Sequence, residues 1–188
     1  GSAGALVFQD FIRRGLYQSA TRTNLFGGSH DPNVWINSSQ TSNATAGSPV
    51  TGPQQWGVNA WPLTRSSAAQ GYLGSPAYTG DGASAYTYTI PLKSSVKTFA
   101  KVWVTATIYF NVNLTTGVVG TKHASIASTT ITSLDNGFWL CSATTTAGVV
   151  SGSNYVQIQA CDSDNVVSTN SPSGSDLYFG KPMVTVGA

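Results

Sequence analysis

The chain has 188 residues, of which 40% are hydrophobic, 11% aromatic and only 9% charged. This length suits a single domain with an ordinary hydrophobic core, and no apolar run is long enough for a membrane-spanning helix, so we expect no membrane insertion. Nine basic residues are scattered among seven acidic ones, giving a formal net charge of +2. Without a basic cluster, nucleic acid is not an expected partner.

The polar residues are of an unusual kind. All seven acids are Asp, Glu is absent, and Ser and Thr together make up about a quarter of the chain. Glu and Lys normally solvate the exposed faces of helices, whereas Thr, Val, Tyr and Trp favour strands. The composition therefore predicts an all-β protein.

The chain begins with a segment that differs from the rest. Gly1-Ser2 is typical of an expression scar, and residues 1–21 are expected to form a connector or neck of short helix or strand. Residues 22–188 are expected to form the β domain. Within it, residues 37–53 are rich in Ser, Thr, Gly and Pro, which indicates loop with at most one strand.

Strand signals follow in the middle of the chain. Residues 55–63 carry apolar side chains at strand spacing, and a Gly-Asp-Gly turn stands at 80–82. In residues 84–90 polar and apolar positions alternate, with Tyr86, Tyr88 and Ile90 on one face.

Residues 99–112 give the clearest period-2 pattern in the chain. We expect one long strand here with a bend or bulge, because strands of this length are uncommon in small domains. The face expected in the core carries Ala100, Val102, Val104, Ala106, Ile108, Phe110 and Val112. The opposite face carries Phe99, Lys101, Trp103, Thr105, Thr107, Tyr109 and Asn111.

The C-terminal third predicts further strands at residues 125–133, 137–146, 154–161 and 176–186, with a polar loop at 162–175. Pro182 inside the last strand indicates an edge or a bulge. Strands of this spacing, joined by turn residues, predict an antiparallel β-sandwich of jelly-roll type.

The two cysteines, Cys141 and Cys161, fall in two successive predicted strands and have no metal-binding spacing. A cross-strand disulfide and a pair of buried free thiols are both compatible with this placement.

Several phrases occur in an order that resembles a known family. They are Arg22-Thr23-Asn24-Leu25, Trp35-Ile36-Asn37-Ser38, the strand from Phe99 to Ala106, Asp135-Asn136-Gly137-Phe138-Trp139-Leu140-Cys141-Ser142, and Tyr178-Phe179-Gly180-Lys181-Pro182-Met183. Together they resemble the carbohydrate-binding-like jelly-roll domains of bacteriophage tail fibres and tailspikes, which are similar to concanavalin-type lectins and glucanases. The resemblance implies a virion location, a homotrimer and a bacterial surface polysaccharide as ligand.

The residues do not suggest an enzyme. Glycoside hydrolysis needs two carboxylates, and Asp31, Asp81 and Asp135 stand in turn sequences. No nucleophile-elbow phrase surrounds a serine, and His30 and His123 have no partner at metal-ligand spacing. A depolymerase is the least favoured of the functions considered.

One oxygen-rich loop carries Asp162, Asp164 and Asn165. Such loops can hold Ca²⁺, although this one departs from the twelve-residue calcium-loop pattern. A structural Ca²⁺ at Asp162 and Asp164 and a simple solvated loop both remain open, and no other cofactor is expected.

The candidate binding residues lie on the non-core face of residues 99–112. Sugars stack on aromatic rings and pair through their hydroxyls with neutral polar groups. Lys101, Trp103, Thr105, Thr107 and Tyr109 share this face, and Gln157 and Gln159 can join it from another strand. The sequence thus predicts a sugar-binding groove. The alternative is that the same face packs against a second layer or a partner subunit, in a trimerisation or capping domain without a ligand.

Overall fold

The computed structural model describes residues 24–25, 42–55, 59–169 and 174–187. The expected connector at 1–21 and the residues His30, Asp31, Trp35 and Trp56 lie outside these ranges. No helix within them is long and apolar enough to cross a membrane.

The larger sheet has eight strands and runs in the order β1-β3-β15-β6-β11-β10, with β2 paired to β3 and β16 paired to β6. All of its pairings are antiparallel. Its members are β1 (Ala44–Ala46), β2 (Val50–Thr51), β3 (Asn59–Arg65), β6 (Tyr86–Ser94), β10 (Ile126–Ser133), β11 (Trp139–Thr145), β15 (Leu177–Phe179) and β16 (Met183–Val186).

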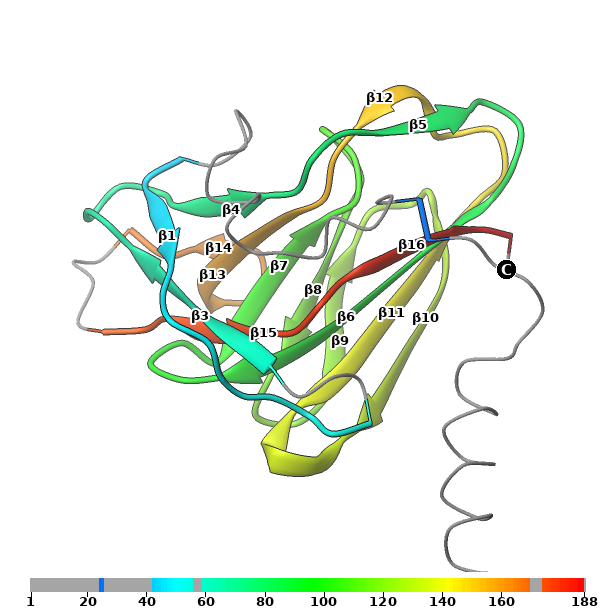
Figure 1. Cartoon of the computed structure of the whole chain (residues 1–188). Helices are drawn as coiled ribbons and strands as arrows, with labels where there is room; N and C mark the ends of the chain where they lie inside the picture. Colours follow the sequence, from blue (N-terminus) through cyan, green and yellow to red (C-terminus); the bar gives the residue numbers. More distant parts are fainter. Residues whose placement is uncertain (1–23, 26–41, 56–58, 170–173, 188) are drawn as a thin grey trace, which may run out of the picture.

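The smaller sheet has six strands in the order β14-β13-β7-β8-β9, with β4 also paired to β13. Its members are β4 (Tyr72–Gly74), β7 (Phe99–Trp103), β8 (Tyr109–Asn113), β9 (Val118–Lys122), β13 (Gln157–Ser163) and β14 (Val166–Val167). A separate pair, β5 (Tyr78–Asp81) and β12 (Ser151–Asn154), extends beyond the two layers (Figure 1). The short 3₁₀ turn η1 (Asp135–Gly137) precedes β11.

The two sheets enclose one hydrophobic core, so the predicted antiparallel sandwich is confirmed. The core is built from every second residue of each strand, because successive side chains point to opposite faces of a sheet. The predicted inward positions are buried; they include Tyr86, Tyr88, Ile90, Ala100, Val102, Phe110, Val112, Ile158 and Ala160. Trp61 is buried as expected, and Trp139 packs half-buried at the edge of this core.

The prediction of a single strand over residues 99–112 is wrong. The chain turns at residues 104–108, and β7 and β8 form an antiparallel hairpin in which Trp103 pairs with Tyr109. The Thr105 hydroxyl accepts hydrogen bonds from the backbone N–H groups of Thr107 and Ile108, at 3.3 and 3.0 Å, which holds the turn. Ala106, expected in the core, is exposed at its tip.

The predicted irregularity at Pro182 is present. Both β15 and β16 pair with β6, and the chain between them passes Pro91. The Gly180 N–H donates to the Pro91 carbonyl at 2.8 Å, and a Cβ at Gly180 would lie 2.8 Å from the Pro91 ring. Only glycine fits this close approach without a shift of the two strands.

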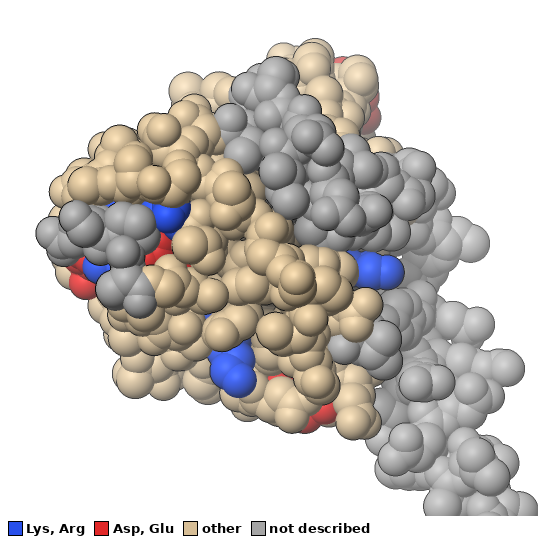
Figure 2. All heavy atoms as spheres, turned by 60° about the vertical axis from the view of Figure 1, so that its left-hand side comes forward, with Lys and Arg blue, Asp and Glu red and all other residues tan. Residues whose placement is uncertain are grey.

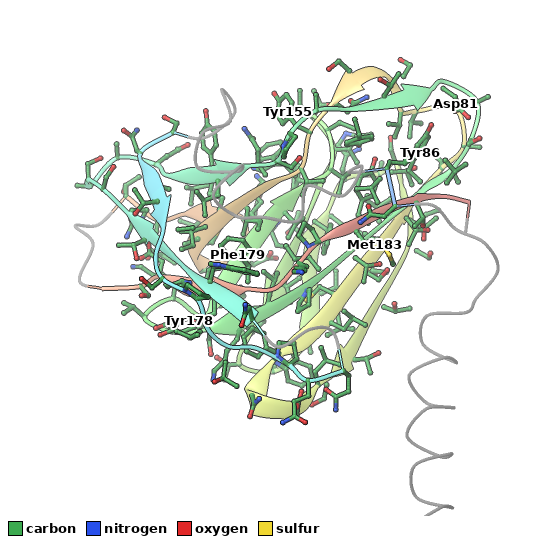
Figure 3. The ribbon with its side chains drawn as sticks, in the orientation of Figure 1. Asp81, Tyr86, Tyr155, Tyr178, Phe179 and Met183 are labelled. Atoms are coloured by element: carbon green, nitrogen blue, oxygen red, sulfur yellow. The ribbon has the colours of Figure 1, made fainter. Side chains whose placement is uncertain are left out.

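Three buried tyrosines anchor the β5–β12 pair to the sandwich. The Tyr78 hydroxyl donates to the Val104 carbonyl at 2.6 Å and lies 2.5 Å from the Tyr88 hydroxyl. The Tyr86 hydroxyl accepts the Asp81 N–H at 2.7 Å, at the end of the pair where Figure 3 labels both residues. Burial raises the pKa of Tyr78 and of Tyr88, so both stay protonated donors.

Cys141 and Cys161 are free and buried. They lie on β11 and β13, which belong to different sheets, so the disulfide alternative is not realised. Burial raises the pKa of the Cys161 thiol to about 12 and raises that of Cys141 further, which keeps both thiols protonated at neutral pH.

A buried ion pair joins β3 to the start of β15. Arg65 Nε lies 2.9 Å from Asp176 Oδ2 and Nη2 lies 3.2 Å from Oδ1, while Nη1 donates to the Ser168 carbonyl at 3.0 Å. The two side chains are 0% and 1% exposed. The bidentate geometry satisfies charges that would otherwise be costly to bury.

Replacing Asp176 by Ala should lower the free energy of unfolding by about 3–5 kcal/mol, because the Arg65 guanidinium is left buried without a counter-charge. Urea denaturation followed by circular dichroism measures this change. Replacing both partners, by Arg65→Met with Asp176→Leu, should cost clearly less. Equal losses in the single and double variants would contradict the importance of the pairing.

Candidate functional site

The candidate site is the side of the six-stranded sheet that faces away from the core, called here the outer face. Strand register arranges its side chains in two rows. Gln159 pairs with Lys101, which pairs with Asn111. One step along, Gln157 pairs with Trp103, which pairs with Tyr109. Five of the predicted binding residues therefore meet on adjacent strands: Lys101, Trp103, Tyr109, Gln157 and Gln159.

Lys101 lies beneath the two aromatic rings. Its Nζ is 4.3 Å from the Trp103 ring centroid and 3.8 Å from the Tyr109 ring centroid, and the two ring centroids are 5.0 Å apart. Nζ also donates to Asn165 Oδ1 at 2.9 Å. The ammonium is attracted to the negative faces of the rings, and this attraction grows as water is excluded. The rings are thus held in a fixed arrangement.

Burial governs the charge of Lys101, whose side chain is only 7% exposed. Removal from water lowers its pKa, and the nearby Cys161 thiol opposes that change to a smaller extent. Each contact made by the ammonium compensates part of the cost of burying it.

Residues 162–167, called here the strap, cover part of the outer face. Asp164 accepts the backbone N–H of Thr121 at 2.9 Å and the Thr121 hydroxyl at 2.8 Å, which ties the strap to β9 across β7 and β8. A Cβ at Gly120 would lie 2.3 Å from the Asp164 carboxylate, so a glycine is needed there. Asn165 reaches Lys101 from the same strap.

The two carboxylates of the predicted calcium loop contact protein groups in the structure. Asp162 forms an ion pair with Lys97 at 2.5 Å, which lowers the pKa of the Asp162 carboxyl, while Asp164 is turned toward Thr121. Within the described ranges, no group of three or more His, Cys, Asp or Glu side chains is placed to hold a metal ion. The two carboxylates have separate protein partners.

Beyond the strap, the second row is open to solvent. Trp103, Tyr109 and Gln157 are half-buried, and His123 lies beside Tyr109 with ring centroids 6.2 Å apart. Gln159 is 3% exposed, and its Oε1 accepts the Trp103 Nε1–H at 3.3 Å. This part of the face combines a fixed aromatic pair with neutral hydrogen-bonding groups.

Thr105 and Thr107 do not join this group. Thr105 is buried and caps the β7–β8 turn, while Thr107 is exposed in the same turn. Their placement follows from the hairpin, which replaces the middle of the expected long strand.

Three further residues of the outer face were not among the predicted sugar-binding residues. Asn165 supports Lys101, and Tyr72 pairs in register with Gln159 from β4. Asn111 is fully buried: its Nδ2 donates to the Thr121 carbonyl, and its Oδ1 has no partner among the described residues. Asn111 could have been found from its odd-numbered position, whereas Asn165 and Tyr72 depend on distant pairings.

The molecular surface is sparsely charged. Figure 2 shows a face that is mostly uncharged, with one group of blue and red side chains at its left and a few separate charged side chains elsewhere. Such a surface favours ligands that are recognised by stacking and neutral hydrogen bonds over ligands held by charge.

No protein-family model matches the chain, and no curated protein sequence matches it. Among solved structures, it is similar to a carbohydrate-binding module, TmCBM27, described for specific mannan recognition. That match covers 89% of this chain and 95% of the module, with 12% identity and a TM-score of 0.42. At this level the likeness carries no argument about fold or function.

Replacing Lys101 by Met should change how stability depends on pH. Because the folded state lowers the pKa of Lys101, the folded protein loses this proton first, and stability from this group rises as pH approaches the ordinary lysine pKa of about 10.4. The unfolding free energy of the wild type minus that of Lys101→Met should therefore increase as the pH rises toward the ordinary lysine pKa.

Urea denaturation at several pH values measures this difference. Tyr78 and Tyr88, whose raised pKa values make stability fall with rising pH, contribute to both proteins and cancel in the subtraction. A difference that stays constant or decreases with pH would show that Lys101 is not desolvated in this way.

Proposed function

We propose that the chain is a non-catalytic carbohydrate-binding module and that its outer face holds a bacterial surface polysaccharide. The observation that carries the proposal is the Trp103–Tyr109 pair, half-buried and fixed above the Lys101 ammonium. A fixed pair loses little conformational freedom on binding, which favours affinity for a small ligand.

The chemistry around the pair suits a sugar. The apolar C–H face of a pyranose stacks on an aromatic ring, and its hydroxyls both donate and accept hydrogen bonds. Gln157 offers both kinds of group beside Trp103, and His123 lies beside Tyr109. The Lys101 ammonium is covered by the two rings and by the strap. This favours a neutral sugar unit over a charged one at this position.

Binding is proposed here instead of hydrolysis because of what the outer face presents. It offers rings and amides, and the carboxylates of its strap, Asp162 and Asp164, are held by Lys97 and Thr121. A hydrolase of the usual kind needs two carboxyl groups about 5–9.5 Å apart flanking the scissile bond.

The wider setting is proposed from the sequence resemblance to phage tail fibres and tailspikes. In that setting the module is part of a homotrimer on the virion and recognises the host surface. A single site would bind weakly, at about millimolar to micromolar Kd, and several copies would supply avidity.

A second candidate is a trimerisation or capping domain without its own ligand. The same half-buried ring pair favours it, because aromatic side chains are also enriched at the centres of protein interfaces. In that case a partner subunit would cover Trp103 and Tyr109.

Replacing Trp103 by Ala distinguishes the two candidates. The first step is to find a ligand by applying the purified chain to arrayed bacterial capsular and lipopolysaccharide glycans. We expect Trp103→Ala to weaken binding of that glycan by about five-fold to about 150-fold, since stacking on one ring contributes about 1–3 kcal/mol in comparable ring contacts. Isothermal titration calorimetry measures the affinity, and sedimentation measures the oligomer.

The exposed Thr132 on β10 gives a matched control, because Thr132→Ala changes the other sheet and should leave binding intact. Loss of the oligomer in Trp103→Ala, with no glycan bound by the wild type, would favour the structural role instead.

A further inference from the structure

A second concave site lies on the other sheet, on the side that faces away from the core. It is a pocket of about 260 Å³, called here the β6 pocket, and its lining comes from four separate parts of the chain. The lining residues are Val50, Thr51, Lys93, Phe138 and Tyr178. Pockets for drug-sized ligands measure about 300–1,000 Å³, so this one suits a single small unit.

Strand register brings its polar groups together. Lys93 on β6 pairs directly with Tyr178 on β15. Their neighbours Leu92 and Phe179 point into the core, so Lys93 and Tyr178 point outward; Figure 3 labels Tyr178 and Phe179 on β15. Thr51 on β2 also lines the pocket.

The loop before β11 fixes the lysine. Lys93 Nζ is 5.6 Å from the centroid of the buried Phe138 ring. A Cβ built on Gly137 would lie 3.7 Å from Lys93 Cε, so the end of the lysine side chain lies against this turn. Gly137 has φ +73°, a conformation that glycine adopts without strain.

The ammonium of Lys93 has no acidic partner within the described parts of the chain, where the ion pairs are Arg65–Asp176 and Lys97–Asp162. Asp135, in the same turn as Gly137, instead accepts the Gln54 backbone N–H with both carboxylate oxygens, at 3.0 and 3.1 Å. The β6 pocket therefore presents a positioned cation beside a ring and two hydroxyls.

We propose that the β6 pocket binds a carboxylate-bearing sugar unit, such as a hexuronate residue of a polysaccharide. The Lys93 ammonium pairs with the carboxylate, the apolar edge of the pyranose contacts the exposed Val50 side chain, and Tyr178 and Thr51 bind its hydroxyls. The proposal rests on the proposed function for the choice of a polysaccharide as ligand. The charge of the pocket then separates it from the ring pair of the outer face, where Lys101 is almost fully buried.

The test is a titration of the ¹⁵N-labelled full chain, followed by NMR, with methyl β-D-glucuronide, methyl β-D-glucoside and sodium acetate in parallel. We expect the glucuronide to shift the amide resonances of Lys93, Phe138 and Tyr178 saturably. The glucoside and acetate should each bind there at least about ten-fold more weakly. Added salt should lower the affinity for the glucuronide, because salt screens the attraction between its carboxylate and Lys93.

The variants Lys93→Gln and Lys122→Gln each remove one positive charge, the first in the pocket and the second on β9 of the other sheet. Lys93→Gln should weaken glucuronide binding at least about ten-fold, and Lys122→Gln should leave it unchanged. The proposal is overturned if glucuronide produces no shifts, if acetate or glucoside matches it, or if Lys93→Gln binds as well as the wild type.

The same spectra separate the two sites. Pocket shifts without any response at Trp103 to the array-selected glycan would support the β6 pocket while removing the proposed function of the outer face. A shift at Trp103 with the array-selected glycan, without shifts at the pocket with glucuronide, would support the proposed function of the outer face and overturn the β6 pocket proposal.

Discussion

The arrangement of the outer face depends on the placement of one ammonium group beneath two aromatic rings. Lys101 is almost fully buried on a face that points away from the core, and its charge is compensated by Trp103, Tyr109 and Asn165. A buried charge is stable only when its partners keep fixed positions, because each lost contact leaves part of the desolvation free energy uncompensated. The same contacts fix the rings in the position that a stacked sugar would need.

Two local features make that placement possible. The β7–β8 turn at residues 104–108 keeps Trp103 opposite Tyr109, so odd-numbered side chains stay on one face of both strands. The strap then closes over one end, anchored by the bonds from Thr121 to Asp164. Because Gly120 leaves space for that carboxylate, the strap lies close to the sheet and excludes water from Lys101.

Much of the sandwich was predictable because alternation is a local property. The faces of β6, β7, β8 and β13 follow directly from their period-2 patterns. The turn after Trp103 was missed because Val104, Ala106 and Ile108 continue the same alternation through it. The position of the strap could not be predicted, because the bond between Asp164 and Thr121 joins residues 43 positions apart and leaves no local signal. Tyr72 and the β6 pocket likewise depend on pairings between distant strands.

In the proposed function, the glycan stacks on the Trp103 ring. The most direct measurement is the ¹H–¹⁵N spectrum of the tryptophan indoles during titration with a glycan selected from the bacterial array. The Trp103 Nε1–H is held by Gln159, so a sugar stacked on the ring should shift this resonance strongly and saturably. The indole resonances of the buried Trp61 and of Trp139, whose Nε1–H bonds to the Leu114 carbonyl, should move little. A saturating glycan that leaves the Trp103 indole unmoved would contradict the account.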